Sequence, residues 1–176
     1  VAALGHSAGG GTILGAARDE RVDGYVSMAS GGPADKAAFP DRPSFFLAGS
    51  LDGIISAKDR TLPAYEAAPA PSRFWEIDGV GHNGFDDFCT FGGGTGIIGI
   101  AEASGLGGLL KAQPQLAKLG QDGCVKPAAP VEEAFPIIRH GVTAWLRWLF
   151  KEDPKPVGLD VDANWPFNLK VTSKSK

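Results

Sequence analysis

The sequence has no long hydrophobic run and no block of basic residues, and each absence excludes a class of protein. No apolar stretch reaches the roughly 20 residues that a transmembrane helix needs. The nearest approach, residues 96–110, is interrupted by Glu102, Ser104 and several glycines. Lysine and arginine total 17 against 20 acidic residues, which gives a formal net charge of −3. We therefore expect no membrane span, and neither nucleic acid nor an anionic membrane surface as a partner.

Cysteine is scarce as well, since Cys89 and Cys124 are the only two. An even number of cysteines flanking one loop-like segment predicts a disulfide. A disulfide would favour a secreted or cell-envelope protein over a cytoplasmic one. Two unrelated buried thiols are the alternative interpretation.

The motif that organises the chain lies at its start. A short apolar run, residues 1–4, is followed by Gly-His-Ser-Ala-Gly at residues 5–9 and then by small residues that can open a helix. Gly-x-Ser-x-Gly between a strand and a helix is the nucleophile elbow of serine hydrolases. It holds the serine in a strained conformation, and we expect Gly5 and Gly9 to avoid the collisions that side chains would cause there. The sequence therefore predicts Ser7 as a nucleophile.

Strand and helix patterns alternate from residue 1 to about residue 84, which predicts an α/β fold with a mostly parallel sheet flanked by helices. Further strands are expected at 22–29, 43–49 and 73–77, helices at 8–17 and 56–68, and a loop or one helical turn at 34–42. Residues 88–130 are predicted to be an irregular insertion with one or two short helices, and a long helix starts near residue 130. We divide the chain into a catalytic domain, residues 1–152, and a tail, residues 153–176, whose end at 170–176 is expected to be frayed.

A serine nucleophile needs a base, and the sequence offers three histidines. His6 precedes the nucleophile and is expected to face away from it, as a packing or hydrogen-bonding residue. His140 falls inside the C-terminal helix, where a partly exposed histidine is expected. His82 follows a predicted strand in a glycine-rich loop, the position from which an imidazole can reach the edge of the sheet. His82 is therefore the predicted base.

The base in turn needs a carboxylate that fixes its tautomer. Asp52 leaves the end of a predicted buried strand, whereas Asp78 lies on the same connection as His82. A carboxylate from a separate strand end orients the imidazole better, so Asp52 is the predicted acid. Asp59, Asp86 and Asp87 fit helix caps or solvated positions. The order nucleophile, acid, histidine is that of the α/β-hydrolases.

Three blocks carry a resemblance to a known family: GHSAGG at 5–10, LAGSLDGI at 47–54 and GVGHNGF at 79–85. They resemble the catalytic blocks of the α/β-hydrolase superfamily, and more narrowly those of esterases like dienelactone hydrolase, chlorophyllase and platelet-activating-factor acetylhydrolase. The resemblance implies Ser7, Asp52 and His82 as the triad. It also implies an oxyanion hole formed by the backbone N–H of Ala8 and by a second N–H from a loop after an earlier strand.

The resemblance further implies that the fold has strands before residue 1. We expect this missing N-terminal half to be a partner in the same fold, and the chain alone to be inactive and poorly soluble. The expected activity is hydrolysis of a small-molecule carboxylic ester, with no metal or organic cofactor. An amidase or peptidase with the same triad, and an inactive hydrolase-like binding module, are the alternatives. The insertion would either form a wall or lid over the acyl pocket or be a surface excursion clipped by a disulfide.

Overall fold

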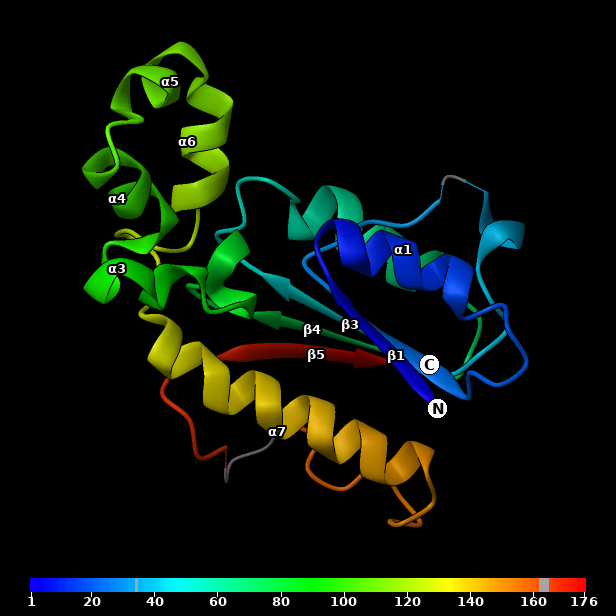
Figure 1. The fold of residues 1–176 in the computed structure, drawn as a ribbon. Coiled ribbons are helices and arrows are strands. Elements are labelled where there is room, and N and C mark those ends of the chain that lie inside the picture. The colour runs from blue at the N-terminus through cyan, green and yellow to red at the C-terminus, as the bar shows by residue number, and fades with distance from the viewer. Residues whose placement is uncertain (34, 162–164) are drawn as a thin grey trace.

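A five-stranded sheet in the order β1-β2-β3-β4-β5 forms the centre of the structure (Figure 1). A computed structural model describes residues 1–33, 35–161 and 165–176. The strands are β1 (Ala2–His6), β2 (Gly24–Met28), β3 (Ser44–Gly49), β4 (Ser72–Ile77) and β5 (Val171–Ser175). The first four are parallel, and β5 runs antiparallel to β4. The carboxyl ends of the parallel strands therefore meet at one edge of the sheet.

Helices cover both faces of this sheet (Figure 1). One face carries α1 (Ala8–Ala16) and α2 (Leu62–Ala67), which continues the π-helical turn η2 (Ala57–Thr61). The other face carries α7 (Val131–Leu149). Because side chains alternate along a strand, the neighbours Phe45 and Phe46 belong to two separate hydrophobic clusters, one on each face. The predicted α/β class, with strands and helices alternating along the parallel part, is confirmed.

The insertion is more helical than expected. Residues 88–130, all of which the structure describes, contain a short 3₁₀ turn, η4 (Phe88–Thr90), and four helical segments rather than one or two. These segments are α3 (Phe91–Gly94), α4 (Gly96–Ala103), α5 (Gly107–Ala112) and α6 (Pro114–Gln121). Glycines with positive φ lie at the ends of these segments or between them: Gly94 ends α3, Gly96 begins α4, and Gly105 lies between α4 and α5. The glycine content that suggested irregular structure thus marks short breaks between helices. We call residues 91–121 the arm, because they project beyond the edge of the sheet (Figure 1).

The end of the chain also differs from the expectation. Residues 170–176 were expected to be frayed, but β5 pairs with β4 from Ile77 and Val171 to Arg73 and Ser175. The expectation was wrong because a stretch rich in lysine and serine is typical of a solvated tail. The pairing of β5 with β4 instead uses backbone N–H and C=O groups, and every residue except proline carries both. The division of the chain at residue 152 stays a prediction.

Two further expectations can be compared with the structure. Residues 36–38 form the 3₁₀ turn η1 (Lys36–Ala38), within the stretch predicted as a loop or one helical turn. Ala34, also in that stretch, and residues 162–164 of the predicted tail lie outside the described residues. Among the helices that the structure describes, none is long and apolar enough to cross a bilayer.

Candidate active site

Ser7 occupies a strained turn between β1 and α1. Its φ of 55° and ψ of −121° lie in a region that residues other than glycine rarely adopt. Its N–H donates to the Met28 carbonyl oxygen on the neighbouring strand (2.9 Å), which holds the turn in place. A Cβ at Gly5 would lie 2.4 Å from the Gly9 carbonyl oxygen, so this glycine is required as expected. A Cβ at Gly9 would meet nothing within 4 Å, and the expected collision at Gly9 was therefore wrong.

Ser7, His82 and Asp52 lie in one chain of hydrogen bonds. The Ser7 Oγ is 2.8 Å from His82 Nε2, and His82 Nδ1 is 2.9 Å from Asp52 Oδ2. The other carboxylate oxygen of Asp52 accepts hydrogen bonds from the N–H groups of Ile54 and Ile55 (2.9 and 2.7 Å). Because an ionised carboxylate only accepts, the proton of a neutral His82 belongs on Nδ1, and Nε2 is free to accept from the serine hydroxyl.

These three residues come from three strand ends. Ser7 follows β1, Asp52 follows β3 and His82 follows β4, so the parallel sheet brings them to one edge. The three side chains differ in exposure: His82 is 1% exposed and Asp52 is 7% exposed, whereas Ser7 is only half-buried. Asp78, the competing carboxylate, is exposed and accepts from the Ser50 hydroxyl (3.0 Å). Ala8 is the first residue of α1, where a backbone N–H has no partner within the helix.

The other two histidines hydrogen-bond backbone carbonyl groups. His6 Nε2 lies 2.9 Å from the His82 carbonyl oxygen, and its Nδ1 lies 3.2 Å from Asp86 Oδ2. The two imidazole rings are 4.9 Å apart, so the expectation that His6 faces away from the site was wrong, although its hydrogen-bonding role was expected. Asp86, expected to be a cap or solvated residue, accepts from the N–H of Phe88 at the start of η4 (2.9 Å), as a cap does, and its side chain is largely buried against His6. His140 is partly exposed on α7, as expected, and bonds the Gly158 carbonyl group.

Asp122, which the sequence did not indicate, links the loops that carry Asp52 and His82. Its Oδ1 accepts from the His82 N–H (2.7 Å) and its Oδ2 from the Gly53 N–H (3.0 Å). Its carbonyl oxygen accepts from the Asn83 N–H (2.8 Å). No motif marks such a residue, because it lies 40 positions from His82 along the chain.

A disulfide closes the insertion directly beside this contact. Cys89 and Cys124 are bonded, as predicted. Cys124 follows Asp122 by two residues, and the Asn83 side chain next to His82 donates to the Leu119 carbonyl oxygen at the base of the arm (2.7 Å). The insertion is thus fastened to the loop that carries His82.

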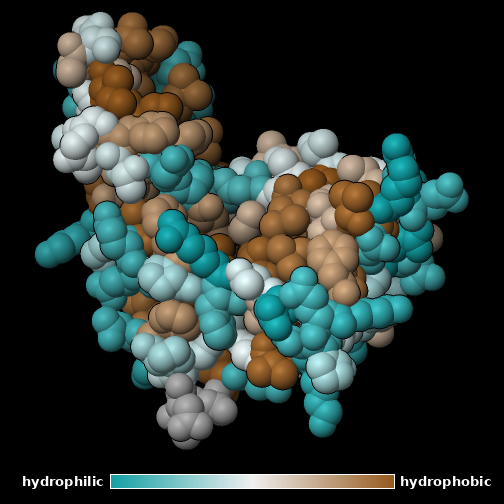
Figure 2. All heavy atoms as spheres, turned by 60° about the horizontal axis from the view of Figure 1, so that its bottom comes forward, coloured by the Kyte–Doolittle hydropathy of each residue, from teal (hydrophilic) through white to brown (hydrophobic). Residues whose placement is uncertain are grey.

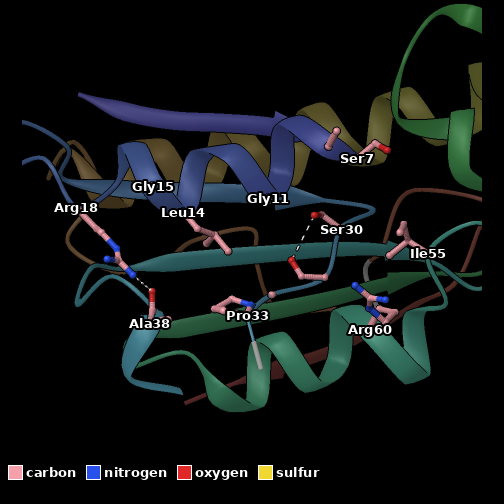
Figure 3. A pocket seen from close by; sticks show the side chains of 13 residues that line it. Ser7, Gly11, Leu14, Gly15, Arg18, Ser30, Pro33, Ala38, Ile55 and Arg60 are labelled. Atoms are coloured by element: carbon pink, nitrogen blue, oxygen red, sulfur yellow. Dashed lines mark hydrogen bonds between the residues drawn. The ribbon is translucent and has the colours of Figure 1, made fainter. Parts of the chain in front are cut away.

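Two cavities open beside Ser7. The first, about 470 Å³, lies between Ser7, His82 and the arm. Its arm side is formed by apolar residues: Ile97, Ile98, Ala101, Leu110, Leu116 and Leu119. Hydrophobic side chains also gather on the outer surface of the arm, where Leu106 and Leu109 are about half exposed (Figure 2). The second cavity, about 610 Å³, lies beneath α1 and is lined by Ser7, Ala8 and two arginines (Figure 3).

The chain matches no known family model and no curated protein. No family is established. Among solved structures, it is similar to an esterase domain from a Rhodothermus marinus protein, with a TM-score of 0.41 and 17% sequence identity. The match covers 46% of this chain and 50% of that one, so the chain spans about half of the length of this neighbour. The narrower resemblance to dienelactone hydrolase-like esterases stays a prediction.

Proposed function

We propose that this chain is the catalytic part of a serine hydrolase with an α/β-hydrolase fold that cleaves carboxylic esters. The observation that carries the proposal is the hydrogen-bond chain from the buried Asp52 through His82 to Ser7. The strained backbone of Ser7 supports it independently, because strain of this kind is characteristic of a nucleophile elbow.

The reaction would proceed in two acyl-transfer steps. In the first, Ser7 Oγ attacks the ester carbonyl carbon while His82 Nε2 takes the hydroxyl proton, and the Ala8 N–H donates to the oxyanion. The carbon–oxygen bond to the alcohol then breaks, and the alkoxide oxygen takes the proton from His82. In the second step a water molecule gives a proton to His82 and attacks the acyl-enzyme, which releases the carboxylic acid and restores Ser7. Asp52 holds the imidazole in the required tautomer throughout.

The arm supplies a hydrophobic wall for the substrate. The cavity that contains His82 and Ser7 is bounded by apolar side chains of α4, α5 and α6. Burial of a hydrocarbon group against this wall would contribute about 25 cal/mol per Å² of apolar surface removed from water. This arrangement favours a wall of the substrate pocket over a mere surface excursion.

A fluorophosphonate probe tests the proposed nucleophile. We expect this chain, assayed together with the N-terminal strands that the resemblance implies, to be labelled, and Ser7→Ala to abolish labelling and to lower ester hydrolysis at least about a thousandfold. Ser104→Ala, which changes an exposed serine on the arm, is the matched control and should behave like the unmodified protein. Labelling that persists in Ser7→Ala would identify another nucleophile. No labelling of the unmodified protein would favour the inactive binding module, and faster cleavage of amides than of matched esters would favour the amidase.

A further inference from the structure

The cavity beneath α1 carries two positive charges and no negative one among its described lining residues. Arg18 lies at one end, where its Nη2 donates to the Ala38 carbonyl oxygen (2.7 Å). Arg60 comes from η2, the turn that follows Asp52, and its side chain extends toward the Ser30–Gly31 loop (Figure 3). Within the part of the chain that the structure describes, neither guanidinium forms an ion pair with a carboxylate. This cavity therefore offers positive charge to a ligand.

The position of Arg60 is set by the backbone beside it. A Cβ at Gly31 would lie 3.0 Å from Arg60 Nε and 3.2 Å from its Nη2, so the guanidinium rests against a residue without a side chain. Ser30 is buried next to it, and its hydroxyl donates to the Gly31 carbonyl oxygen (3.3 Å). Arginine presents a planar group of N–H donors that matches the geometry of a carboxylate.

Ser7 lines both cavities, but His82 lines only the apolar one. The histidine must give its proton to the leaving alcohol, so the alcohol part of a substrate belongs on the apolar side. The acyl part then extends from Ser7 past Ala8 into the cavity of the arginines, so on this assignment the arm bounds the alcohol part and not, as the sequence suggested, an acyl pocket. We infer that the preferred substrates are monoesters of dicarboxylic acids with an apolar alcohol, whose free carboxylate binds Arg60. This inference rests on the proposed ester hydrolysis.

Two esters that differ only in the distal carboxylate provide the test. Monobutyl adipate carries it, whereas butyl hexanoate has the same acyl length without it, and both release butanol. We expect kcat/KM to be at least about tenfold higher for monobutyl adipate, the effect of one charge-assisted hydrogen bond. Arg60→Gln should lower this ratio about tenfold, and Arg60→Lys should lower it less. Arg139→Gln changes an exposed arginine on α7 that lies over the Phe135 ring and should leave the ratio unchanged.

Failure of this inference can be told apart from failure of the proposed function. If neither ester is hydrolysed and Ser7 is not labelled, the proposed function fails and the inference fails with it. If both esters are hydrolysed but the ratio stays near one, or does not respond to Arg60→Gln, the carboxylate subsite is overturned alone. The reversed ester, 6-butyryloxyhexanoate, carries the carboxylate on the alcohol side, and a preference for it would overturn the assignment of the two cavities. About 1 M salt screens charges beyond about 3 Å and should reduce the ratio in the unmodified protein.

Discussion

At the scale of single residues, replacing Asp122 tests whether its carboxylate positions the loops of Asp52 and His82 or contributes to substrate binding. It accepts from the N–H groups of both His82 and Gly53, and an amide in its place can accept through only one oxygen. We expect Asp122→Asn to lower kcat about tenfold with little change in KM, because the loops of the base and the acid lose a shared partner. Steady-state kinetics on a neutral ester check this, with Glu102→Gln on the arm as the control. A rise in KM at constant kcat would contradict a positioning role.

The two glycines of the elbow should respond differently to alanine. Gly5→Ala places a Cβ 2.4 Å from the Gly9 carbonyl oxygen, so the turn must open. We expect it to lower the free energy of unfolding by more than about 2 kcal/mol and to reduce labelling of Ser7. Gly9→Ala meets open space inside α1 and should be neutral or stabilise by up to about 1 kcal/mol. Thermal melts of both variants check this, and equal destabilisation would refute the distinction.

Tyr25 should lower the free energy of unfolding at alkaline pH. It is fully buried on β2, and burial raises the pKa of its hydroxyl to about 12, with the nearby Ser44 hydroxyl opposing the shift. Because the folded state favours the neutral hydroxyl, the stabilisation linked to this raised pKa is fully present below the unfolded pKa of about 10. It is lost as the pH rises through about 12. The loss amounts to about 2 to 3 kcal/mol. Denaturant melts between these pH values should show it, and Tyr25→Phe should remove this part of the pH dependence.

From the sequence alone, Ser7, Asp52 and His82 are predicted as a triad, and the structure brings these three side chains into one chain of hydrogen bonds. Ser7, Asp52 and His82 each follow a strand, and short-range patterns identify strand ends. Asp122 was missed, and so was the contact of His6 with His82, because both arise from tertiary packing between segments that are far apart in the sequence.

At the scale of elements, the disulfide ties the insertion to the site. Its two cysteines are separated by 35 residues, and a closed loop of this length stabilises by about 3 to 4 kcal/mol in the chain-entropy model. We expect the Cys89→Ser and Cys124→Ser double variant to lose stability by a similar amount. Hydrogen exchange should rise first in the arm and in the loop that carries His82, because Cys124 follows by two residues Asp122, which accepts from the His82 N–H. Uniformly faster exchange across the sheet would argue against this local role.

The arm also shows where element prediction was limited. Its glycines were interpreted as irregular structure, yet they separate helices whose apolar side chains line a cavity. Hydrophobic periodicity needs about 11 residues to be distinguished, and no segment of the arm is that long. The parallel strands, by contrast, were predictable because each is a short apolar run bounded by turn residues.

At the scale of the whole molecule, β5 forms the edge of the sheet opposite β1. It follows α7, crosses to the far edge of the sheet, and pairs with β4 over five residues. The Trp75 Nε1 donates to the Leu159 carbonyl oxygen and to the Ser173 hydroxyl, so a buried residue of β4 depends on the tail. The tail thus completes the core beneath β4 and covers that strand's outer edge.

Removing residues 170–176 should therefore cost both stability and solubility. The truncation leaves the backbone groups of β4 that face β5 unpaired and partly exposes Trp75, and an open strand edge pairs readily with another chain. We expect a lower melting temperature and concentration-dependent self-association, measured by calorimetry and by light scattering. Lys174→Gln, which changes one exposed side chain and keeps the backbone pairing, is the control. The truncated chain could instead show an unchanged melting temperature and no greater self-association than the unmodified chain. Pairing with β5 would then not protect this edge, and the apolar contacts of Trp75 would suffice to hold β4 in place.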